Sequence, residues 1–152
     1  MLANIQIEQT TFHIVQTSWI KSENDLRAIR TPVFIAEQLV APDFEWDDID
    51  TTAVHLLASL NKQPIACLRI IDYHKIGRMA VLKDWRSKGL GSALLLEAVK
   101  ICKAHGSKSV HLSAQTHAIH FYQQAGFKIT SEVYQDLHIP HVDMQLDLSY
   151  WG

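Results

Sequence analysis

The sequence predicts an α/β (α+β) domain, in which a mixed, mostly antiparallel twisted sheet is flanked by helices on both faces. Three extended apolar runs follow one another between residues 51 and 82, the pattern of neighbouring antiparallel strands. An amphipathic stretch over 89–105 then predicts a helix, and it leads into another extended run at 110–114. The 152 residues suit one domain, 1–152, able to bury about two-thirds of its unfolded surface.

The amino-terminal part predicts a strand followed by helices. Residues 12–19 alternate in polarity, as a half-buried strand does. Ser22 with Asp25 gives a plausible helix start, and we expect two helical pieces separated near Pro32, because proline cannot sit inside a regular helix. Such a pair often borders a substrate site.

The central part predicts a hairpin with a third strand beside it. Residues 51–60 and 64–72 flank Asn61-Lys62-Gln63, which is typical of a tight turn between two strands. The run from Lys75 to Leu82 would add the third strand of an antiparallel half.

The carboxy-terminal part begins with the helix over 89–105 and continues with short elements. Gly106 favours the end of that helix, and the apolar positions Leu90, Leu94, Ala98 and Ile101 share one helical stripe. A short helix is predicted over 117–125, with Gly126 as a left-handed cap and Phe127 opening the next strand.

Composition and charge exclude several classes of protein. A net charge of −2 with a pI near 6.5 gives no general attraction for DNA or RNA. Cys67 and Cys102 do not suggest a disulfide framework, and we expect two buried thiols. Residues 1–11 lack the pattern of a signal peptide, and no apolar run approaches the roughly 18 residues of a membrane span, so we expect a cytoplasmic protein.

The segment from Arg86 to Leu94 joins a strand to a helix and predicts a phosphate site. The first N–H groups of a helix lack intrahelical partners, and two glycines let the backbone approach an anion closely. Lys83, Arg86 and Lys88 add positive charge against Asp84. A Walker loop is excluded because no Gly-Lys-Ser/Thr follows, and a Rossmann fingerprint would need glycine where Leu94 stands.

Two motifs carry a resemblance to a known family. The Arg-x-x-Gly-x-Gly at 86–91 resembles motif A of the GNAT superfamily of acyl-CoA-dependent N-acyltransferases, and the segment 118–127 resembles its Ala-x-x-Phe-Tyr-x-x-x-Gly-Phe segment. Residues 32–38 (PVFIAEQ) and 139–144 (IPHVDM) are similar to an ElaA-like branch. Together these matches span nearly the whole chain.

The resemblance implies a sheet splayed between the strand ending at Leu82 and the strand at 110–114, with a crevice for the pantetheine arm of coenzyme A. The implied donor is acetyl-CoA, which a primary amine would attack directly in a ternary complex. Tyr122 would donate to the departing thiolate, and Gln115 stands where many members carry an asparagine that contacts pantetheine. The implied cofactor-binding residues are Met79, Ala80, Val81, Arg86, Ser87, Lys88, Gly89, Leu90, Gly91, Ser92 and Gln115.

The base that takes a proton from the amine is less determined. Glu37 and His141 are our two candidates, while His55 and His111 are read as structural histidines on strands. The acidic run 45–50 is typical of a solvated loop and hints at a basic acceptor. The His-x-x-His pairs at 117–120 and 138–141 lack the further ligands of a metal site, so none is expected.

Two functions from different classes stay open. The first is an N-acetyltransferase, and the alternative is a catalytically silent acyl-CoA-binding sensory or interaction module. The presence of Tyr122 favours the enzyme, because a binder has no chemical need for an acid there. The acceptor is either a small amine or a protein amine. The apolar tail 144–151 would complete its own sheet or extend across a partner, which leaves a homodimer possible.

Overall fold

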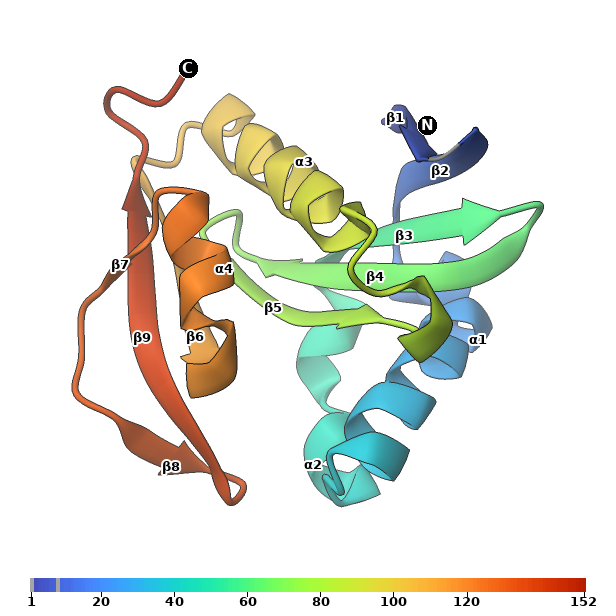
Figure 1. Cartoon of the computed structure of the whole chain (residues 1–152), viewed down its shortest axis with the longest axis horizontal. Helices are drawn as coiled ribbons and strands as arrows, with labels where there is room; N and C mark the ends of the chain where they lie inside the picture. Colours follow the sequence, from blue (N-terminus) through green and yellow to red (C-terminus); the bar gives the residue numbers. More distant parts are fainter. Residues whose placement is uncertain (1, 8) are drawn as a thin grey trace.

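The computed structural model describes residues 2–7 and 9–152 and shows a twisted sheet with helices on both faces (Figure 1). The strands are β1 (Ala3–Ile7), β2 (Thr10–Thr17), β3 (Val54–Leu60), β4 (Gln63–Ile71), β5 (Lys75–Val81), β6 (Ser109–Gln115), β7 (Lys128–Ile129), β8 (Tyr134–Asp136) and β9 (Ile139–Asp147). The helices are α1 (Trp19–Arg30), α2 (Pro42–Glu45), α3 (Leu90–Ala104) and α4 (Ile119–Gln124), with a π-helix η1 (Thr31–Glu37) and 3₁₀ turns η2 (Asp48–Thr51), η3 (Lys83–Trp85) and η4 (Thr116–Ala118). The predicted fold class is confirmed.

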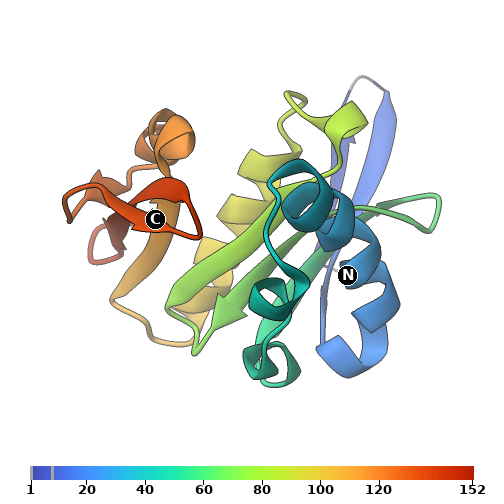
Figure 2. The same ribbon diagram turned by 90° about the horizontal axis from the view of Figure 1, so that it is seen from below.

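The strand order is β1-β2-β3-β4-β5-β6-β9-β7, with β8 paired to β9. Neighbouring strands run antiparallel except β5 and β6, which are parallel and are connected through α3. A parallel pair needs a crossover of this kind, because its strands start at the same end of the sheet. Seen from below, the part with β6, β9 and α4 stands beside the part with β1 to β5 as a separate arm of the sheet (Figure 2).

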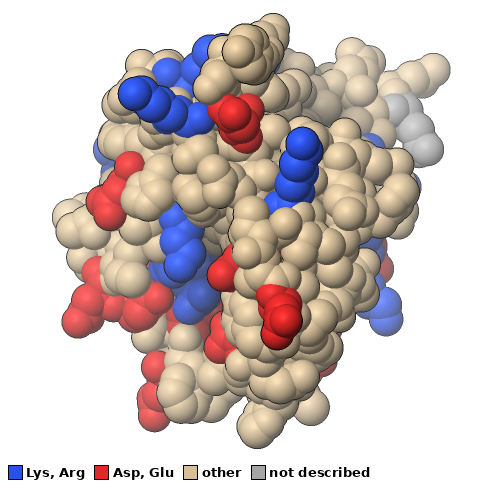
Figure 3. Space-filling view, turned by 90° about the vertical axis from the view of Figure 1, so that its left-hand side faces the viewer, with Lys and Arg blue, Asp and Glu red and all other residues tan. Residues whose placement is uncertain are grey.

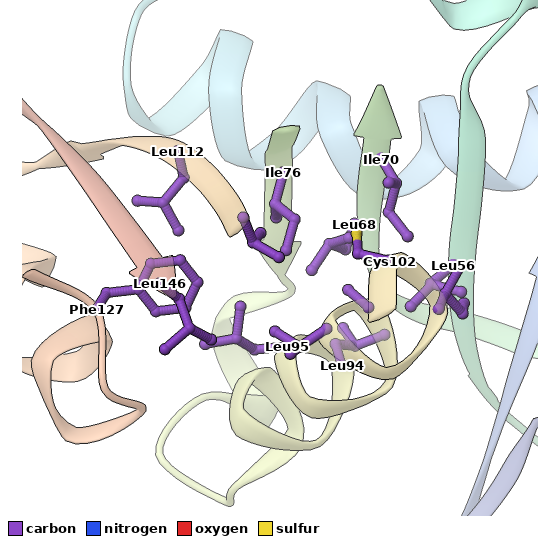
Figure 4. Close-up of a cluster of buried hydrophobic side chains, with 14 of the residues drawn as sticks. Leu56, Leu68, Ile70, Ile76, Leu94, Leu95, Cys102, Leu112, Phe127 and Leu146 are labelled. Atoms are coloured by element: carbon purple, nitrogen blue, oxygen red, sulfur yellow. The ribbon is translucent and has the colours of Figure 1, made fainter. Parts of the chain in front are cut away.

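The larger core lies between α3 and the sheet. The predicted stripe of α3 is buried: Leu90, Leu94, Ala98 and Ile101 are all 8% exposed or less. These side chains meet strand residues from both arms of the sheet, among them Leu68, Ile76, Leu112 and Leu146 (Figure 4). Burial of this stripe is what holds the two arms together behind the opening between β5 and β6.

A smaller core lies on the opposite face, under α1. Trp19, Leu26 and Ile29 of α1 pack there with Val33 of η1 and with Cys67 of β4. This packing fixes α1 and η1 against the face of the sheet away from α3. Of the two, η1 borders the opening between β5 and β6 from the side opposite α3.

The start of α1 differs from the prediction. The helix begins at Trp19, three residues before Ser22, because Ser18 is the N-cap and its hydroxyl accepts from the Lys21 N–H at 3.3 Å. Ser22 has non-helical angles (φ −128°, ψ 19°) and marks a kink that joins two helical pieces, so the second piece does begin after Ser22, as predicted. The Ser22 hydroxyl lies 2.6 Å from that of Thr17. The predicted break near Pro32 is confirmed, since α1 ends at Arg30 and Pro32 lies in the first turn of η1.

Several further expectations are settled by the strands. Asn61 and Lys62 both have positive φ (49° and 67°), as the favoured two-residue hairpin turn requires, so the predicted hairpin is confirmed. Strand β1 was missed by the sequence analysis.

The apolar tail completes the chain's own sheet, because β9 pairs with β6 from Ser109↔Asp147 to Gln115↔His141. Within the part of the chain that is described, no helix is both long and apolar enough to cross a membrane.

Candidate active site

The opening between β5 and β6 is the centre of the candidate site. The two strands are matched only at Lys75↔His111 and Ile76↔Leu112 within the described chain. Just beyond, the β4–β5 register shifts between Cys67 and Arg69, and Arg78 has a positive φ of 48°. A bulge of this kind bends its strand, so β5 turns away from β6. The splay expected from the resemblance is therefore confirmed.

Val81 presents its backbone to this opening. The Leu82 N–H donates to the Ile65 carbonyl of β4 at 3.0 Å, and because successive residues alternate along a strand, the N–H of Val81 is directed away from β4. The Val81 carbonyl has the same direction and accepts from Arg86 Nε at 2.9 Å. Ala80, in contrast, is buried opposite Cys67. Among Met79, Ala80 and Val81, the backbone of Val81 is thus the best placed to meet a ligand.

The start of α3 lies beside this strand end and has an anion-binding character. Its N-cap is Gly89, with a φ of 84° and no side-chain cap, so the first-turn N–H groups of Leu90, Gly91 and Ser92 are left to other partners. Ser87 also has a positive φ, of 61°, which turns the loop toward the helix. A Cβ on Gly91 would lie 3.6 Å from the Phe121 ring, so this residue faces α4 across the loop.

Arg86 and Glu37, predicted separately as a phosphate ligand and a base, contact each other. Arg86 Nη2 lies 2.8 Å from Glu37 Oε2, and the side chains are 39% and 34% exposed. Since Arg86 also donates to the Val81 carbonyl, it connects the end of η1 with the end of β5. Lys88 has no such ion pair within the described chain and is the more available cation for an anion at α3.

A cavity of about 400 Å³ opens between the arms of the sheet on the side of η1 and α2. Its walls include Phe34 from η1, Met79 from β5, Gln115 from β6, Tyr122 from α4 and His141 from β9. Glu37 is not among the described residues that line it. The volume is in the usual range for a small-molecule site. The cavity therefore brings together Tyr122 and one of the two predicted bases.

Tyr122 has an apolar environment and is one of the residues that line the cavity. Its ring packs edge-to-face against Phe121 and Phe127, with centroids 5.0 and 6.0 Å apart. Burial raises the pKa of Tyr122 to about 12. The hydroxyl therefore stays protonated at physiological pH and can donate a hydrogen bond. Gly126 has the left-handed φ (98°) predicted for the end of this helix.

Gln115 is held at both ends of its amide. Its Nε2 donates to Gln38 Oε1 at 2.8 Å, and its Oε1 accepts from His117 Nε2 at 2.7 Å. These contacts tie the end of β6 to the end of η1. Gln115 lies on the cavity wall, where the resemblance places a pantetheine contact, but its amide already has two protein partners.

His141 lines the cavity, and its hydrogen bond identifies which ring nitrogen can accept a proton. Its Nδ1 is 2.7 Å from the Ile139 carbonyl, and a carbonyl can only accept, so Nδ1 carries the proton and Nε2 the lone pair of the neutral ring. The ring is 9% exposed and stacks beside Tyr134 at a centroid distance of 6.1 Å. Of the two predicted bases, His141 is thus the one with access to the cavity.

The acidic run 45–50 is not the solvated loop that the sequence suggested. Glu45 and Asp50 are 2% and 1% exposed, and they pair with Arg30, itself 1% exposed. The pKa of Glu45 is raised above its usual value, because the effect of burial exceeds the opposing effect of the nearby arginines. These carboxylates neutralise buried arginines and do not form an exposed surface for a basic acceptor.

Other titratable groups have structural positions. His55 is 1% exposed and its Nε2 donates to the Asp50 carbonyl at 2.9 Å; burial lowers its pKa, so the structural interpretation holds. Cys67 and Cys102 are free and buried, and burial raises their pKa values to about 12 and about 11. Such thiols are poor nucleophiles. Among residues 2–7 and 9–152, no three His, Cys, Asp or Glu side chains come together to hold a metal ion.

Sequence reasoning missed Gln38, Arg69 and Arg78, which all line the cavity. The signal for the two arginines was present, because each is a charged residue inside an otherwise apolar strand. Charged residues are rarely buried there without a specific partner.

Comparison with known proteins agrees with this geometry. Residues 28–148 match the model of the acetyltransferase (GNAT) domain family. The chain is 32% identical over 134 residues to the Bacillus subtilis N-acetyltransferase YjcF, covering 84% of this chain and 96% of YjcF. It is 33% identical over 127 residues to Escherichia coli protein ElaA, covering 78% and 83% of the two chains.

Solved structures give the same result. The crystal structure of Escherichia coli ElaA superimposes with a TM-score of 0.80 at 28% identity, over 90% of this chain and 99% of ElaA. An acyl-CoA N-acyltransferase from Pseudomonas aeruginosa gives a TM-score of 0.79 at 30% identity, over 89% and 99% of the chains. The chain therefore belongs to the GNAT family of acetyltransferases, in the branch that includes ElaA.

Proposed function

We propose that this chain transfers an acetyl group from acetyl-CoA to a primary amine by direct attack in a ternary complex. The observation that carries the proposal is the continuity of the site. The uncapped start of α3 lies beside the end of β5, whose edge toward β6 has no strand partner there among the described residues, and Met79 of β5 lines the cavity together with Tyr122 and His141. A donor and an acceptor could therefore meet at the strand end from opposite faces of the sheet.

The residues of the proposed donor site suit the binding of coenzyme A. The N–H groups of Leu90, Gly91 and Ser92 with Lys88 would hold the diphosphate, because a helix start binds anions through both its dipole and its N–H groups. Val81 would pair with the pantetheine arm as an added strand does. When bound, the thioester of acetyl-CoA supplies an activated acyl group, and the remaining steps belong to the side chains around it.

In the proposed chemistry, one residue accepts a proton and two groups donate hydrogen bonds. His141 Nε2 takes a proton from the incoming ammonium, directly or through water. A backbone N–H near Val81 donates to the thioester oxygen as negative charge develops there. As the C–N bond forms and the C–S bond breaks, the second proton of the nitrogen passes to the departing sulfur, directly or through water, while the Tyr122 hydroxyl donates a hydrogen bond to that sulfur. Buried Cys67 and Cys102 supply no nucleophile, which is why we favour direct attack over a covalent enzyme intermediate.

The surface gives no reason to prefer nucleic acid as the acceptor. On the face shown in Figure 3, basic and acidic side chains are interspersed among uncharged residues. The net charge of −2 agrees with this distribution. A small amine or a protein amine is the acceptor that we propose.

The first test is calorimetric titration with acetyl-CoA. We expect saturable one-to-one binding, about tenfold weaker for Lys88→Ala, which is a loss of about 1.4 kcal/mol, and weaker again for the Arg86→Ala, Lys88→Ala double variant. Lys62→Ala is the matched control, because Lys62 is an exposed lysine in the β3–β4 turn. Absence of wild-type binding at millimolar acetyl-CoA would overturn the proposal.

The second test is acetyl transfer itself, measured as release of the coenzyme A thiol with a panel of primary amines. Turnover that needs the amine and yields the N-acetyl product supports transfer. Tight acetyl-CoA binding with no turnover on any small amine or amine-bearing peptide would instead support the binding module. The position of Tyr122 on the cavity wall is the reason that we favour transfer.

A further inference from the structure

One wall of the cavity belongs to a cluster of three arginines and three carboxylates, which we call the arginine–carboxylate cluster. Its members come from α1, the 45–50 run, β4 and β5, and Glu45, Arg69 and Arg78 line the cavity. The members are Arg30, Glu45, Asp47, Asp50, Arg69 and Arg78. Its formal charge is zero, so charge alone does not say what it binds.

Within the cluster, every carboxylate oxygen already has a guanidinium partner. Glu45 Oε2 and Oε1 meet Arg30 Nε at 2.7 Å and Arg78 Nε at 3.1 Å. Asp47 Oδ1 and Oδ2 meet Arg69 Nη1 at 2.8 Å and Arg78 Nη2 at 3.4 Å. Both oxygens of Asp50 accept from Arg30, at 2.8 and 3.2 Å. The three guanidinium charges therefore balance the three carboxylates, and the cluster has no net negative charge to attract a cation.

The cluster leaves several hydrogen-bond donors without partners. Arg69 is 5% exposed, and its Nε is buried without a hydrogen-bond partner. Only Nη1 of Arg69 is engaged, by Asp47 and Asp50, so its Nε–Nη2 edge is unpaired among the described residues. Arg78 bonds through Nη2; its Nε lies 3.1 Å from Glu45 Oε1 but makes no hydrogen bond, and its Nη1 has no partner among the described residues. Lys75, on the same wall, has no ion pair with the described residues.

A buried guanidinium edge without a partner is costly, and the group that suits it is a carboxylate, which matches its two parallel N–H groups. We propose that the acceptor is an amine that also carries a carboxylate, bound at the wall formed by Arg69 and Arg78. This inference rests on the proposed function, because it assigns the acceptor of the same site. It replaces the basic acceptor that the acidic run suggested.

The rest of the cavity agrees with such an acceptor. With its carboxylate on the arginine wall, the molecule's amine would extend toward the side lined by Tyr122 and His141. Phe34 and Ile139, also on the walls, offer apolar contact to the carbon chain between the two groups. A diamine would place a second ammonium against unpaired N–H donors, which is repulsive.

The test compares each acid with its own amide. The substrates are β-alanine, γ-aminobutyrate and δ-aminovalerate, with α-amino acids as a further series, each beside its carboxamide. In the ω-amino pairs the amine is nearly the same, so a difference reports the carboxylate. For the acid of best length we expect a kcat/KM about tenfold or more above that of its amide, mainly through KM.

Arg69→Lys is the diagnostic variant. It keeps a positive charge near Asp47 and Asp50 but removes the Nε–Nη2 edge. We expect the acid-to-amide ratio to fall toward one, with Arg78→Lys lowering it less. Lys62→Gln is the control and should keep the wild-type ratio. Circular dichroism and acetyl-CoA calorimetry check the fold of each variant. If neither arginine variant folds, the acid-to-amide ratio of kcat/KM in the wild type decides whether the inference stands.

A binding arm separates this inference from the proposed function. Each acid and each amide is titrated into protein saturated with coenzyme A. Acids that bind better than their amides, and lose that advantage in Arg69→Lys, support the carboxylate site even if no amine is acetylated. Turnover of amines with no preference for the acid in any pair, in rate or in binding, would overturn the inference and leave the transferase standing. A preference for diamines would overturn it as well.

Discussion

Removing the hydroxyl of Tyr122 tests the mechanism most directly. Burial raises the pKa of Tyr122 to about 12, whereas an ordinary thiol has a pKa near 8.5. Full proton transfer from the phenol to the thiolate would therefore be uphill by about 5 kcal/mol. We therefore propose that Tyr122 acts as a hydrogen-bond donor to the departing sulfur, with its proton remaining largely on the tyrosine.

The expected size of the effect follows from that part. A hydrogen bond to a charged group contributes about 1.5–3 kcal/mol, so Tyr122→Phe should lower kcat about 10- to 150-fold. The measurement is thiol release at saturating acetyl-CoA with an amine that the wild type acetylates. Because the hydroxyl stays protonated, the wild-type rate should show no alkaline fall due to Tyr122 below about pH 11.

Two results would refute this reasoning. An unchanged kcat would remove Tyr122 from the mechanism. An alkaline limb near pH 10 that is present in the wild type and absent in Tyr122→Phe would show that the hydroxyl ionises in the working range, against the effect of its burial. Calorimetry with acetyl-CoA on the same variant separates a loss of chemistry from a loss of donor binding.

Three further predictions address other parts of the site. His141→Gln should lower kcat by about a hundredfold with acetyl-CoA binding retained, and thiol-release kinetics with calorimetry would show it. Cys67→Ala and Cys102→Ala should each keep turnover, and mass spectrometry should detect no acetyl-enzyme; trapped acetyl-cysteine would contradict direct attack. Burial alone would raise the pKa of Asp50, but Arg30 and Arg69 hold it below its usual range, so the stability it contributes is present above about pH 4 and is lost as pH falls through the lower folded-state value. Asp50→Asn should therefore cost about 3 kcal/mol in the neutral range and progressively less below pH 4, as urea unfolding at several pH values would reveal.

The fold could be predicted largely from local patterns. The stripe of α3, the turn at Asn61-Lys62 and the glycine cap at Gly126 each follow from short-range rules, and each was confirmed. The prediction for α1 was incomplete, because Ser18 caps a first turn before the kink at Ser22 where the expected piece begins. Strand β1 was missed although its five residues, ANIQI, alternate apolar and polar, so the signal was present but short.

The candidate site was predicted where residues adjacent in sequence act together, as in the loop before α3. It was not predicted where partners lie far apart in the chain. The pairing of Glu37 with Arg86 joins residues 49 positions apart, and no pattern in either segment indicates it. The burial of Glu45 and Asp50 was misread for the same reason, since charged runs are usually solvated unless distant arginines neutralise them.

Arg86 has a consequence for any effort to redesign this protein. One guanidinium touches the carbonyl of Val81 in β5 and the carboxylate of Glu37 in η1. If β5 holds the coenzyme and η1 borders the amine, as we propose, sequence changes in η1 intended to alter which amine is accepted are expected to change the Michaelis constant for the coenzyme as well. The two specificities would then be thermodynamically linked, and a library that varies them separately would sample few functional combinations.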